Sequence, residues 1–445
     1  MTMGKRSRES QQELFVLADE LPQGGGHAFY ERLSRLLADA CFDDLVESLC
    51  EPYYESEERR GRPSIPPGVY FRMLMVGYFE GIGSQRGIAW RCADSLSLRR
   101  FLGVKLTEAT PDHSSLTRVR DRLPLEAHQR AFELVLAVAA ERGLLKGKTI
   151  AVDSTTLEAN AAMKSIVRRD TGEDWKAYVA GLMEEEGLVE EGEEPTDEDL
   201  RRFDKKRKKK VSNDDWESKT DPDSRITRMK DGRTHLAYKA EHAVDLDTEL
   251  ILAAEVYEGD HSDTQTLADT AVAAQTHLGA AGRDETIEEV VADKGYHAAP
   301  QLELVDSLGL RTYVPEPTRK HKSRWDNKPV ELRQAVEANR RRTKTEKNSK
   351  LQRLRSERVE RSFAHVCETG GARRSWLQGI EKVRKRLLIT AAARNLGLLM
   401  RKLMGVGKPR ALQGALATLL QLALRLLNLS IQECARKGSV SSTGC

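Results

Sequence analysis

Two short stretches, KTIAVD at residues 148–153 and IEEVVAD at residues 287–293, decide the fold class. Each is a β-branched, apolar run that ends in an aspartate, which predicts a buried strand followed by a carboxylate. Further strands are predicted at 238–244, 250–256 and 311–314, and helices at 262–277 and 299–308. Strands that alternate with helices indicate an α/β layer.

The chain before residue 145 has the apolar spacing of helices. Long helices are predicted at 31–49 and 69–79, and three shorter ones are expected to be capped by Ser84, by Ser95 or Ser97, and by Asp112. Short helices joined by tight turns suit a helix-turn-helix-like DNA binder. An ordinary helical bundle with a solvated basic face would give the same pattern. The arginines that could contact DNA here are Arg86, Arg91, Arg99, Arg100 and Arg118.

The length of 445 residues suggests two or three domains. We expect a helical domain at 1–145, an α/β domain at 146–405 with insertions at about 161–233 and 317–355, and a C-terminal helix and tail at 406–445. The six cysteines form no CxxC pair and are expected to be reduced thiols in a cytoplasmic protein. The apolar stretch 411–431 is interrupted by polar residues, so it predicts a packing helix rather than a membrane span.

The net charge of +3 does not by itself indicate a nucleic-acid partner, but the charge is unevenly distributed. An acidic stretch at 184–199 is followed by the basic block KKRKKK at 205–210, which is either solvated or in contact with a DNA backbone. The second insertion, 318–355, is strongly basic and shows little apolar periodicity. We favour phosphate contact there, through residues that include Arg340, Arg341 and Arg342.

The two aspartates that follow the opening stretches, Asp153 and Asp293, are the main candidates for chemistry. Carboxylates at strand ends lie where α/β proteins bind ligands. Two that converge repel each other unless a cation lies between them, and Mg²⁺ prefers such oxygen ligands. Two ions about 3.5–4 Å apart can activate the attacking oxygen and stabilise the leaving oxygen of a phosphodiester. Alternatively, each aspartate is only a turn former or helix cap.

A third acid is expected from a helix at 355–368, which offers Glu357 and Glu360. Val359, Phe363 and Val366 form one apolar stripe that must face the sheet. At about 100° per residue, Glu360 lies about 90° from the centre of this stripe and Glu357 about 150°. Glu360 can therefore reach the strand ends, whereas Glu357 points to solvent.

Several blocks of the chain resemble bacterial insertion-sequence transposases with a DDE catalytic core. GRPSIPPGVYFRMLMVGYFEGIGSQRGIAWRCADSLSLRRFLG (61–103) and ATPDHSSLTRVRDRL (109–123) are similar to their N-terminal DNA-binding domain. IAVDSTTLEANAAM (150–163), VVADKGYHA (290–298) and the region from Glu360 to Leu403 resemble the three catalytic blocks, and DGRTHLAYKAEHAVDLDTELILA (231–253) resembles the hairpin between the first two. The blocks occur in the family's order and cover about residues 10–405.

The resemblance implies an RNase H-like mixed-sheet catalytic domain preceded by an all-helical N-terminal DNA-binding domain. It implies that Asp153, Asp293 and Glu360 bind two Mg²⁺ ions, for which Mn²⁺ can substitute, with Asp153 bridging both. Water would attack a phosphodiester at the element's end, and the freed 3′-hydroxyl would attack target DNA. The expected partner is double-stranded DNA, both element ends and target, with the protein a dimer when assembled on it. Neither a membrane nor a covalent protein–DNA intermediate is expected.

One departure concerns the tyrosine–arginine–glutamate–lysine signature that many relatives carry. Here Arg353, Ser356 and Cys367 occupy the tyrosine, arginine and lysine positions, so only Glu360 remains. This puts any hairpin-forming step in doubt. The arginines that could replace the lost phosphate contacts are Arg355, Arg358, Arg373 and Arg374.

Other residues near the predicted site have simpler interpretations. Gly295 is expected to serve a turn, with Lys294 a candidate for phosphate contact, and His242 is expected to be packed or hydrogen-bonded. Glu158 and Asp260 are spare acids. Trp376, in a basic turn, could stack on a base, but it is expected to pack in the core. Two alternative functions remain: a catalytically silent DNA-binding protein derived from a transposase, and an RNase H-like nuclease that cuts without joining.

Overall fold

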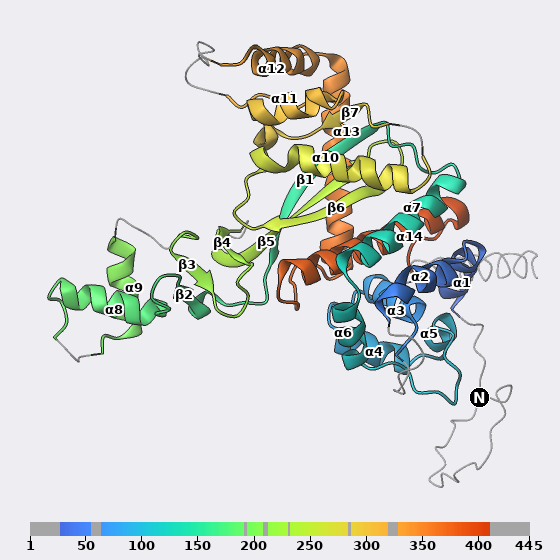
Figure 1. The fold of residues 1–445 in the computed structure, drawn as a ribbon, viewed down its shortest axis with the longest axis horizontal. Coiled ribbons are helices and arrows are strands. Elements are labelled where there is room, and N and C mark those ends of the chain that lie inside the picture. The colour runs from blue at the N-terminus through green and yellow to red at the C-terminus, as the bar shows by residue number, and fades with distance from the viewer. Residues whose placement is uncertain are drawn as a thin grey trace, which may run out of the picture.

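The computed structural model describes residues 27–54, 64–190, 194–207, 212–229, 232–283, 286–318 and 328–409. A helical N-terminal region is followed by a mixed α/β sheet domain, as predicted (Figure 1). The block at 205–210 is described only to residue 207, and the predicted C-terminal helix at 411–431 lies outside the described residues. The cysteines within the described residues are free thiols, in agreement with the sequence.

The helical region confirms the predicted caps. Ser84 accepts a hydrogen bond from Gly87 N, Ser95 from Leu98 N, and Asp112 from Ser115 N. These three residues begin the fourth to sixth helices of the region, which consists of α1 (Ala28–Asp39), α2 (Phe42–Cys50), α3 (Pro67–Glu80), α4 (Gln85–Ala93), α5 (Leu96–Phe101), α6 (His113–Arg122) and α7 (Leu125–Glu141).

The single helix predicted at 31–49 is wrong, because the chain breaks between α1 and α2. Cys41 adopts a left-handed conformation with φ of 48° at the break. The apolar face of α1 packs against α5, whereas that of α2 packs against α3 and α7. One straight helix could not present its stripe to both sets of partners.

The main sheet has six strands in the order β4-β5-β1-β7-β8, with β6 also paired to β5. β1 is antiparallel to β5, and β5 to both β4 and β6, whereas β1, β7 and β8 are parallel. The strands are β1 (Thr149–Glu158), β4 (Arg225–Arg228), β5 (Thr234–Asp245), β6 (Ile251–Glu258), β7 (Glu289–Val291) and β8 (Arg311–Tyr313). Antiparallel and parallel pairs therefore meet at β1, the central strand.

Helices cover both faces of this sheet. α10 (Asp263–Ala280) packs against β6, β5 and β1, and α13 (Glu346–Phe363) packs against β1, β5 and β7. Neighbouring residues of β1 point to opposite faces. Asp153 is paired with His242, whose ring stacks on Phe363 of the α13 layer, so Asp153 faces α13. The next residue, Ser154, faces α10.

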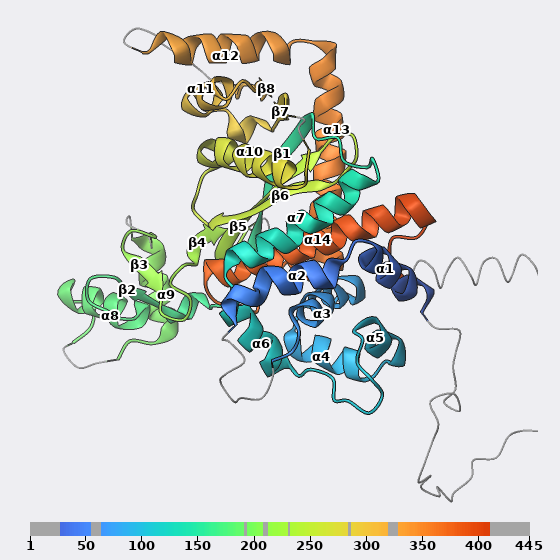
Figure 2. The same cartoon turned by 45° about the vertical axis from the view of Figure 1, so that its right-hand side comes forward.

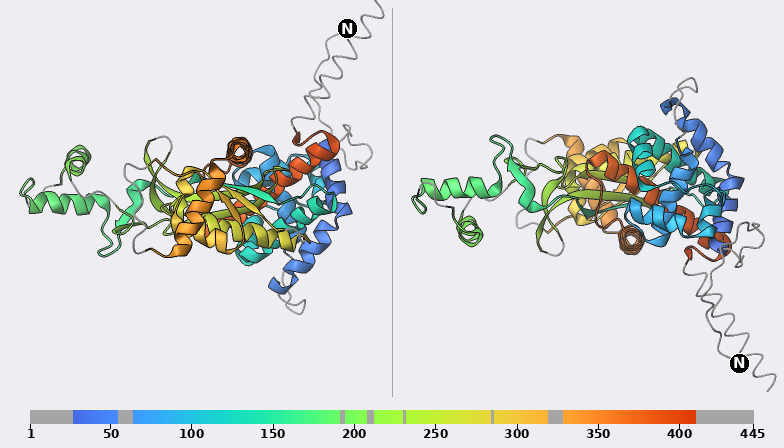
Figure 3. Two further views of the ribbon diagram at one scale, coloured as in Figure 1. Left: turned by 90° about the horizontal axis from the view of Figure 1, so that it is seen from above. Right: turned by 90° about the horizontal axis from the view of Figure 1, so that it is seen from below.

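The first insertion forms an arm that extends from the main body in both views of Figure 3. It contains β2 (Ile166–Arg168), paired with β3 (Trp216–Ser218), and the helices α8 (Trp175–Glu185) and α9 (Asp197–Lys206). A small core of its own, built on Val179, Met183 and Leu200, packs α8 against α9. The acidic stretch 184–199 thus includes the ends of two helices.

The second insertion is more ordered than its sequence suggested. It contains α12 (Val330–Thr343) and the first part of α13, which begins at Glu346 rather than at 355. Polar contacts hold α12 against the sheet. The Asn339 side-chain amide accepts a hydrogen bond from the Val314 N–H and donates one to the Val314 carbonyl. Arg342 donates hydrogen bonds to the carbonyl and the hydroxyl of Thr312, which fixes α12 to β8 at the edge of the sheet. α12 also packs against α11 (Ala299–Ser307).

A long helix, α14 (Ile380–Met404), lies with α7 between the other helices of the helical region and the sheet (Figure 2). α14 packs against α7, β6 and α3. It is buried around most of its circumference from Leu387 to Met400 and therefore shows no apolar stripe in the sequence. The helical region and the sheet consequently share one continuous apolar core.

Candidate active site

The parallel pairing of β1 with β7 sets the positions of the two predicted aspartates. Ala151 lies opposite Val291 in the register, so Asp153 and Asp293 each follow two residues later on adjacent chains. The prediction that the strand ends at Asp153 is wrong, since β1 continues to Glu158. It continues because β5 pairs with β1 along its whole remaining length, whereas β7 ends at Val291.

Asp153 is a largely buried carboxylate whose side chain is 24% exposed. Its Oδ2 accepts a hydrogen bond of 2.5 Å from Nη1 of Arg355 on α13, and its Oδ1 accepts one of 2.8 Å from Ser154 N. Burial raises the pKa of the Asp153 carboxyl, Arg355 opposes this effect, and the nearby carboxylates of Asp293 and Asp263 raise the pKa further. Two further carboxylates therefore act on Asp153 at this point of the sheet.

Asp293 lies at the start of a short turn, Lys294–Tyr296, that follows β7. Its Oδ1 accepts a hydrogen bond of 2.7 Å from Gly295 N. A Cβ atom at residue 295 would come within 2.9 Å of the same oxygen, so a side chain there would displace the carboxylate. The predicted turn role of Gly295 is confirmed, and Lys294 beside it is exposed.

Glu360 stands apart from the aspartates on the exposed surface of α13. Its Oε1 accepts a hydrogen bond of 3.0 Å from the Ser356 hydroxyl. Glu357 is also exposed and is paired at 2.5 Å with Arg361, which in turn contacts Glu249. Within the described part of the chain, no three His, Cys, Asp or Glu residues are grouped so that they could hold a metal ion.

Asp263, the first residue of α10, is the site residue that sequence reasoning missed. Ser154 Oγ donates a hydrogen bond of 2.8 Å to Asp263 Oδ1, and Lys239 Nζ lies 2.8 Å from the same oxygen. The capping box of Ser262 and Gln265 marks the helix start, and this pattern was present in the sequence. The position of Asp263 near Asp153, however, depends on its contact with Ser154, 109 residues away in the sequence. No local sequence pattern encodes such a contact.

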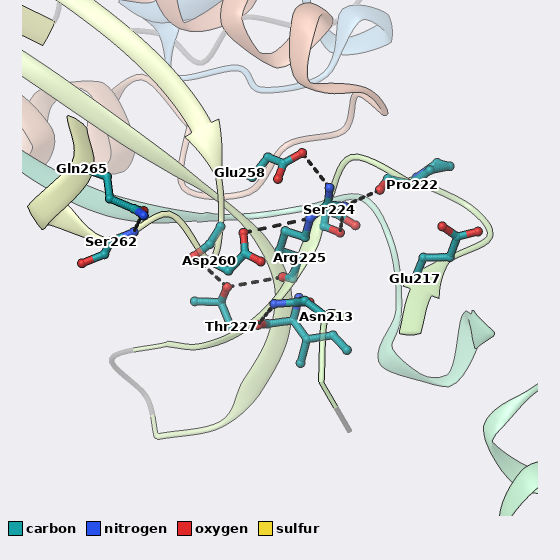
Figure 4. A network of polar contacts seen from close by, with 12 residues as sticks. Asn213, Glu217, Pro222, Ser224, Arg225, Thr227, Glu258, Asp260, Ser262 and Gln265 are labelled. Atoms are coloured by element: carbon teal, nitrogen blue, oxygen red, sulfur yellow. Dashed lines mark hydrogen bonds and ion pairs between the residues drawn. The ribbon is translucent and has the colours of Figure 1, made fainter. Parts of the chain in front are cut away.

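Glu158 and Asp260 have basic partners within the protein, and His242 is packed and hydrogen-bonded, as expected. Glu158 lies 3.9 Å from His235 and 3.7 Å from Arg374, and Asp260 lies 4.0 Å from Arg225 in the network of Figure 4. His242 is buried, its Nδ1 lies 3.0 Å from Ser362 Oγ, and burial lowers its pKa to about 3.

Several arginines predicted to contact DNA already have partners within the protein. Arg340 is paired with Glu316 at 2.9 Å, and Arg99 donates to three carbonyls of the loop that follows α5. Arg91 is paired with Glu80, and Arg342 is bonded to Thr312. The exposed arginines of the predicted set are Arg86, Arg100, Arg118, Arg341 and Arg374, of which Arg100 lies 3.7 Å from Glu31 and Arg374 lies 3.7 Å from Glu158.

A basic segment, residues 373–374, lies beside the end of β1. Glu158 N donates to the carbonyl of Arg373, so residues 373–374 run alongside the strand that carries Asp153. Arg373 reaches Thr155 Oγ1 at 3.3 Å, and the Arg374 guanidinium lies 5.2 Å from the ring centre of Trp376. The prediction that Trp376 packs in the core is wrong, because its side chain is 53% exposed. Trp376 lies in the segment between the Glu158–Arg374 bridge and the start of α14 at Ile380.

Trp376 also borders a cavity of about 330 Å³ between α3, α4 and α14. Apolar side chains such as Tyr78 and Ile88 line most of it, with Arg86 and His113 among its polar residues. None of the candidate acids lines this cavity, so it is separate from the carboxylates. No helix of the described residues is long and apolar enough to cross a membrane.

Comparison with protein families gives two matches that together span both parts of the fold. Residues 146–396, more than half of the chain, match the family described as Transposase DDE domain. Residues 16–122 match the family described as Transposase domain (DUF772). A comparison with curated proteins finds no match.

Proposed function

The chain belongs to the transposases with a DDE domain, and from this premise we propose that it binds the terminal inverted repeats of an insertion sequence and cuts and joins DNA. The observation that carries the proposal is the register of β1 with β7, which sets Asp153 beside Asp293. Both side chains supply oxygen ligands at the point where the parallel pairing ends. This is a place where sheet enzymes bind their ligands.

Two carboxylates at this point, Asp153 and Asp293, offer oxygen ligands that suit a divalent cation. Burial raises the pKa of the Asp153 carboxyl, and the nearby carboxylates of Asp293 and Asp263 raise it further. The repulsion between these carboxylates favours a bound cation. The Arg355 guanidinium is paired with Asp153 at 2.5 Å, so this carboxylate already has a positively charged partner within the protein. We propose that Asp153 and Asp293 hold Mg²⁺, or Mn²⁺ in its place. The bound metal would activate the attacking oxygen and stabilise the leaving oxygen.

Glu360 is our choice for the third carboxylate. It follows the buried Val359 on α13, the helix whose Arg355 touches Asp153. Its side chain is exposed and is bonded to the Ser356 hydroxyl, so it can turn toward a cation at little cost. Glu357 is less suited, because Arg361 already neutralises it.

The DNA backbone would follow the basic segment beyond β1. Arg373 and Arg374 lie beside Glu158, at the end of the strand that carries Asp153, and Trp376 offers an exposed aromatic face there. Phosphates bind arginines with a strong dependence on salt. Exposed Arg86 and Arg118 of the helical region would bind DNA further along, and a dimer would hold the two element ends.

The test combines purified protein, Mg²⁺ and DNA that carries candidate terminal inverted repeats. Cleavage and strand transfer are expected, and Asp153→Asn and Asp293→Asn should lower both rates by roughly 10⁴-fold or more while DNA binding remains. Glu360→Gln should have the same effect, whereas the matched variant Glu357→Gln should retain nearly full activity.

Each contrary outcome has a distinct meaning. Activity that survives Asp293→Asn would remove this residue from the site, and an inactive Glu357→Gln with an active Glu360→Gln would reverse our choice of the third acid. Cleavage without strand transfer would show a nuclease. No reaction with any divalent metal, together with tight repeat binding, would show a silent DNA-binding protein.

A further inference from the structure

A buried polar cluster lies on the face of the sheet opposite to the Asp153 side chain. Ser154 is paired with Glu241 across β1 and β5, so the two side chains share the face that α10 covers. Lys239 is two residues from Glu241 and points to the same face. Lys239 is 3% exposed and Glu241 is fully buried, so solvent does not stabilise either charge.

Lys239 is held by groups from two elements. Its Nζ lies 2.8 Å from Asp263 Oδ1, 2.8 Å from Thr266 Oγ1 and 3.6 Å from Glu241 Oε2. A buried ammonium is tolerated only when it is paired and hydrogen-bonded, and these contacts meet that condition. The lysine therefore fixes the start of α10 against β5.

Asp263 connects this cluster to both aspartates of the proposed metal site. Through Oδ1 it accepts the hydroxyl of Ser154, the residue that follows Asp153. Its Oδ2 approaches Gly295, where an added Cβ would lie 3.2 Å from it and 2.9 Å from Asp293 Oδ1. One carboxylate thus contacts the chain beside Asp153 and closely approaches the turn that orients Asp293.

The loop that leads into Asp263 is itself fixed, as Figure 4 shows. Arg225 of β4 pairs with Glu258 at 2.6 Å and lies 4.0 Å from Asp260. Thr227 donates a hydrogen bond to the Gly259 carbonyl, and Ser262 and Gln265 close the capping box. Asp263 is therefore presented from a rigid loop rather than from a free helix end.

We propose that Asp263, held by Lys239, is a positioning residue that sets the placement of Asp153 relative to Asp293 and so controls the affinity of the site for metal. The inference rests on the proposed function, in which these two aspartates bind the cation. Groups that orient metal ligands without touching the metal typically change metal affinity by about 10–100-fold when they are removed.

The first measurement is calorimetric titration of the DNA-free protein with Mn²⁺. Asp263→Ala is expected to weaken Mn²⁺ binding by about 10–100-fold. The control Asp269→Ala removes an exposed carboxylate from the same helix and should bind Mn²⁺ like the wild type. Since Asp263→Ala leaves Lys239 with fewer partners and can impair folding, Ser154→Ala provides a milder test and should weaken binding in the same direction.

The second measurement separates positioning from ligation. Excess Mn²⁺ should restore cleavage by Asp263→Ala, because its ligands remain, whereas Asp293→Ala should stay inactive at every metal concentration. Wild-type Mn²⁺ affinity in both Asp263→Ala and Ser154→Ala would overturn the inference. If Asp153→Asn also left the affinity unchanged, the proposed metal site itself would fail, so the two failures are distinguishable.

Discussion

Buried histidines tie the stability of this protein to pH through single side chains. His242 stacks on Phe363 with ring centres 4.1 Å apart, and burial lowers its pKa to about 3. His128 is bonded to the Tyr70 hydroxyl and to the Pro124 carbonyl, and burial lowers its pKa to about 4. Both rings remain neutral in the folded protein at pH values where an unfolded chain protonates them.

The stability should therefore fall in acid. Since the folded pKa of His242 lies below its ordinary value of 6.5, its contribution is complete above pH 6.5 and is lost as the pH falls toward 3. One such group adds a slope of up to about 1.4 kcal/mol per pH unit. Urea unfolding between pH 4 and 7 should show that the free energy of unfolding depends less steeply on pH in His242→Gln than in the wild type. The variant should also be less stable at neutral pH.

The matched control is His113→Gln, which changes an exposed histidine at the start of α6. This variant shows how far the loss of an exposed imidazole alone changes the dependence of stability on pH. An unchanged slope in His242→Gln would mean that this ring is protonated in the fold, in contradiction to its burial.

At the scale of elements, Gly397 inside α14 allows α3 and the chain that follows α14 to approach this helix closely. A Cβ atom at Gly397 would lie 2.9 Å from the carbonyl of Gly407 and 3.3 Å from the ring of Phe79 on α3. The carbonyl belongs to the chain that turns back after the helix, so it cannot move like a flexible side chain. Gly397 thus allows three segments to meet at one point.

Gly397→Ala should accordingly destabilise the protein by about 1–3 kcal/mol through overpacking. Gly181, inside α8, has open space at the Cβ position and is the matched control. Gly181→Ala should stabilise by up to about 1 kcal/mol, because alanine favours helix formation. Thermal unfolding measures both, and equal effects of the two substitutions would contradict the close contact at Gly397.

Elements defined by local chemistry could be predicted from the sequence, whereas those defined by their surroundings could not. Ser84 and Asp112 cap helices through bonds to backbone only three residues away, so both helix starts were predictable. The length of β1 depends on pairing with β5, about 90 residues later, and α14 has no polar face to reveal it. In the candidate site, strand patterns found Asp153 and Asp293, but Asp263 is brought there by tertiary contacts.

The whole molecule is organised around the packing of α7 on α14. His277 of α10 lies 2.8 Å from Glu133 of α7, and both side chains are buried. Lys385 of α14 donates to the Arg120 carbonyl at the end of α6. Together with the shared apolar core, these contacts make the helical region part of the same packed unit as the sheet.

Unfolding should therefore be a single cooperative event. Differential scanning calorimetry of the full chain should give one transition that includes both the helical region and the sheet, since both contribute to one apolar core. A fragment that begins at residue 146 should lack a stable fold, because it exposes the α14 surface that α7 and α3 cover. Two separate transitions, together with a folded fragment, would contradict this view.

The shared core also has a genetic consequence. Gene copies that have lost their 5′ portion would encode a chain without α3 and α7, in which the apolar surface of α14 is exposed. Quality-control proteases remove such unfolded polypeptides. Under the proposed function, such truncated chains would not accumulate as competitors that occupy repeats without cutting. Copies truncated in this way would then contribute no folded protein, so active transposase would come only from copies that also encode the helical region.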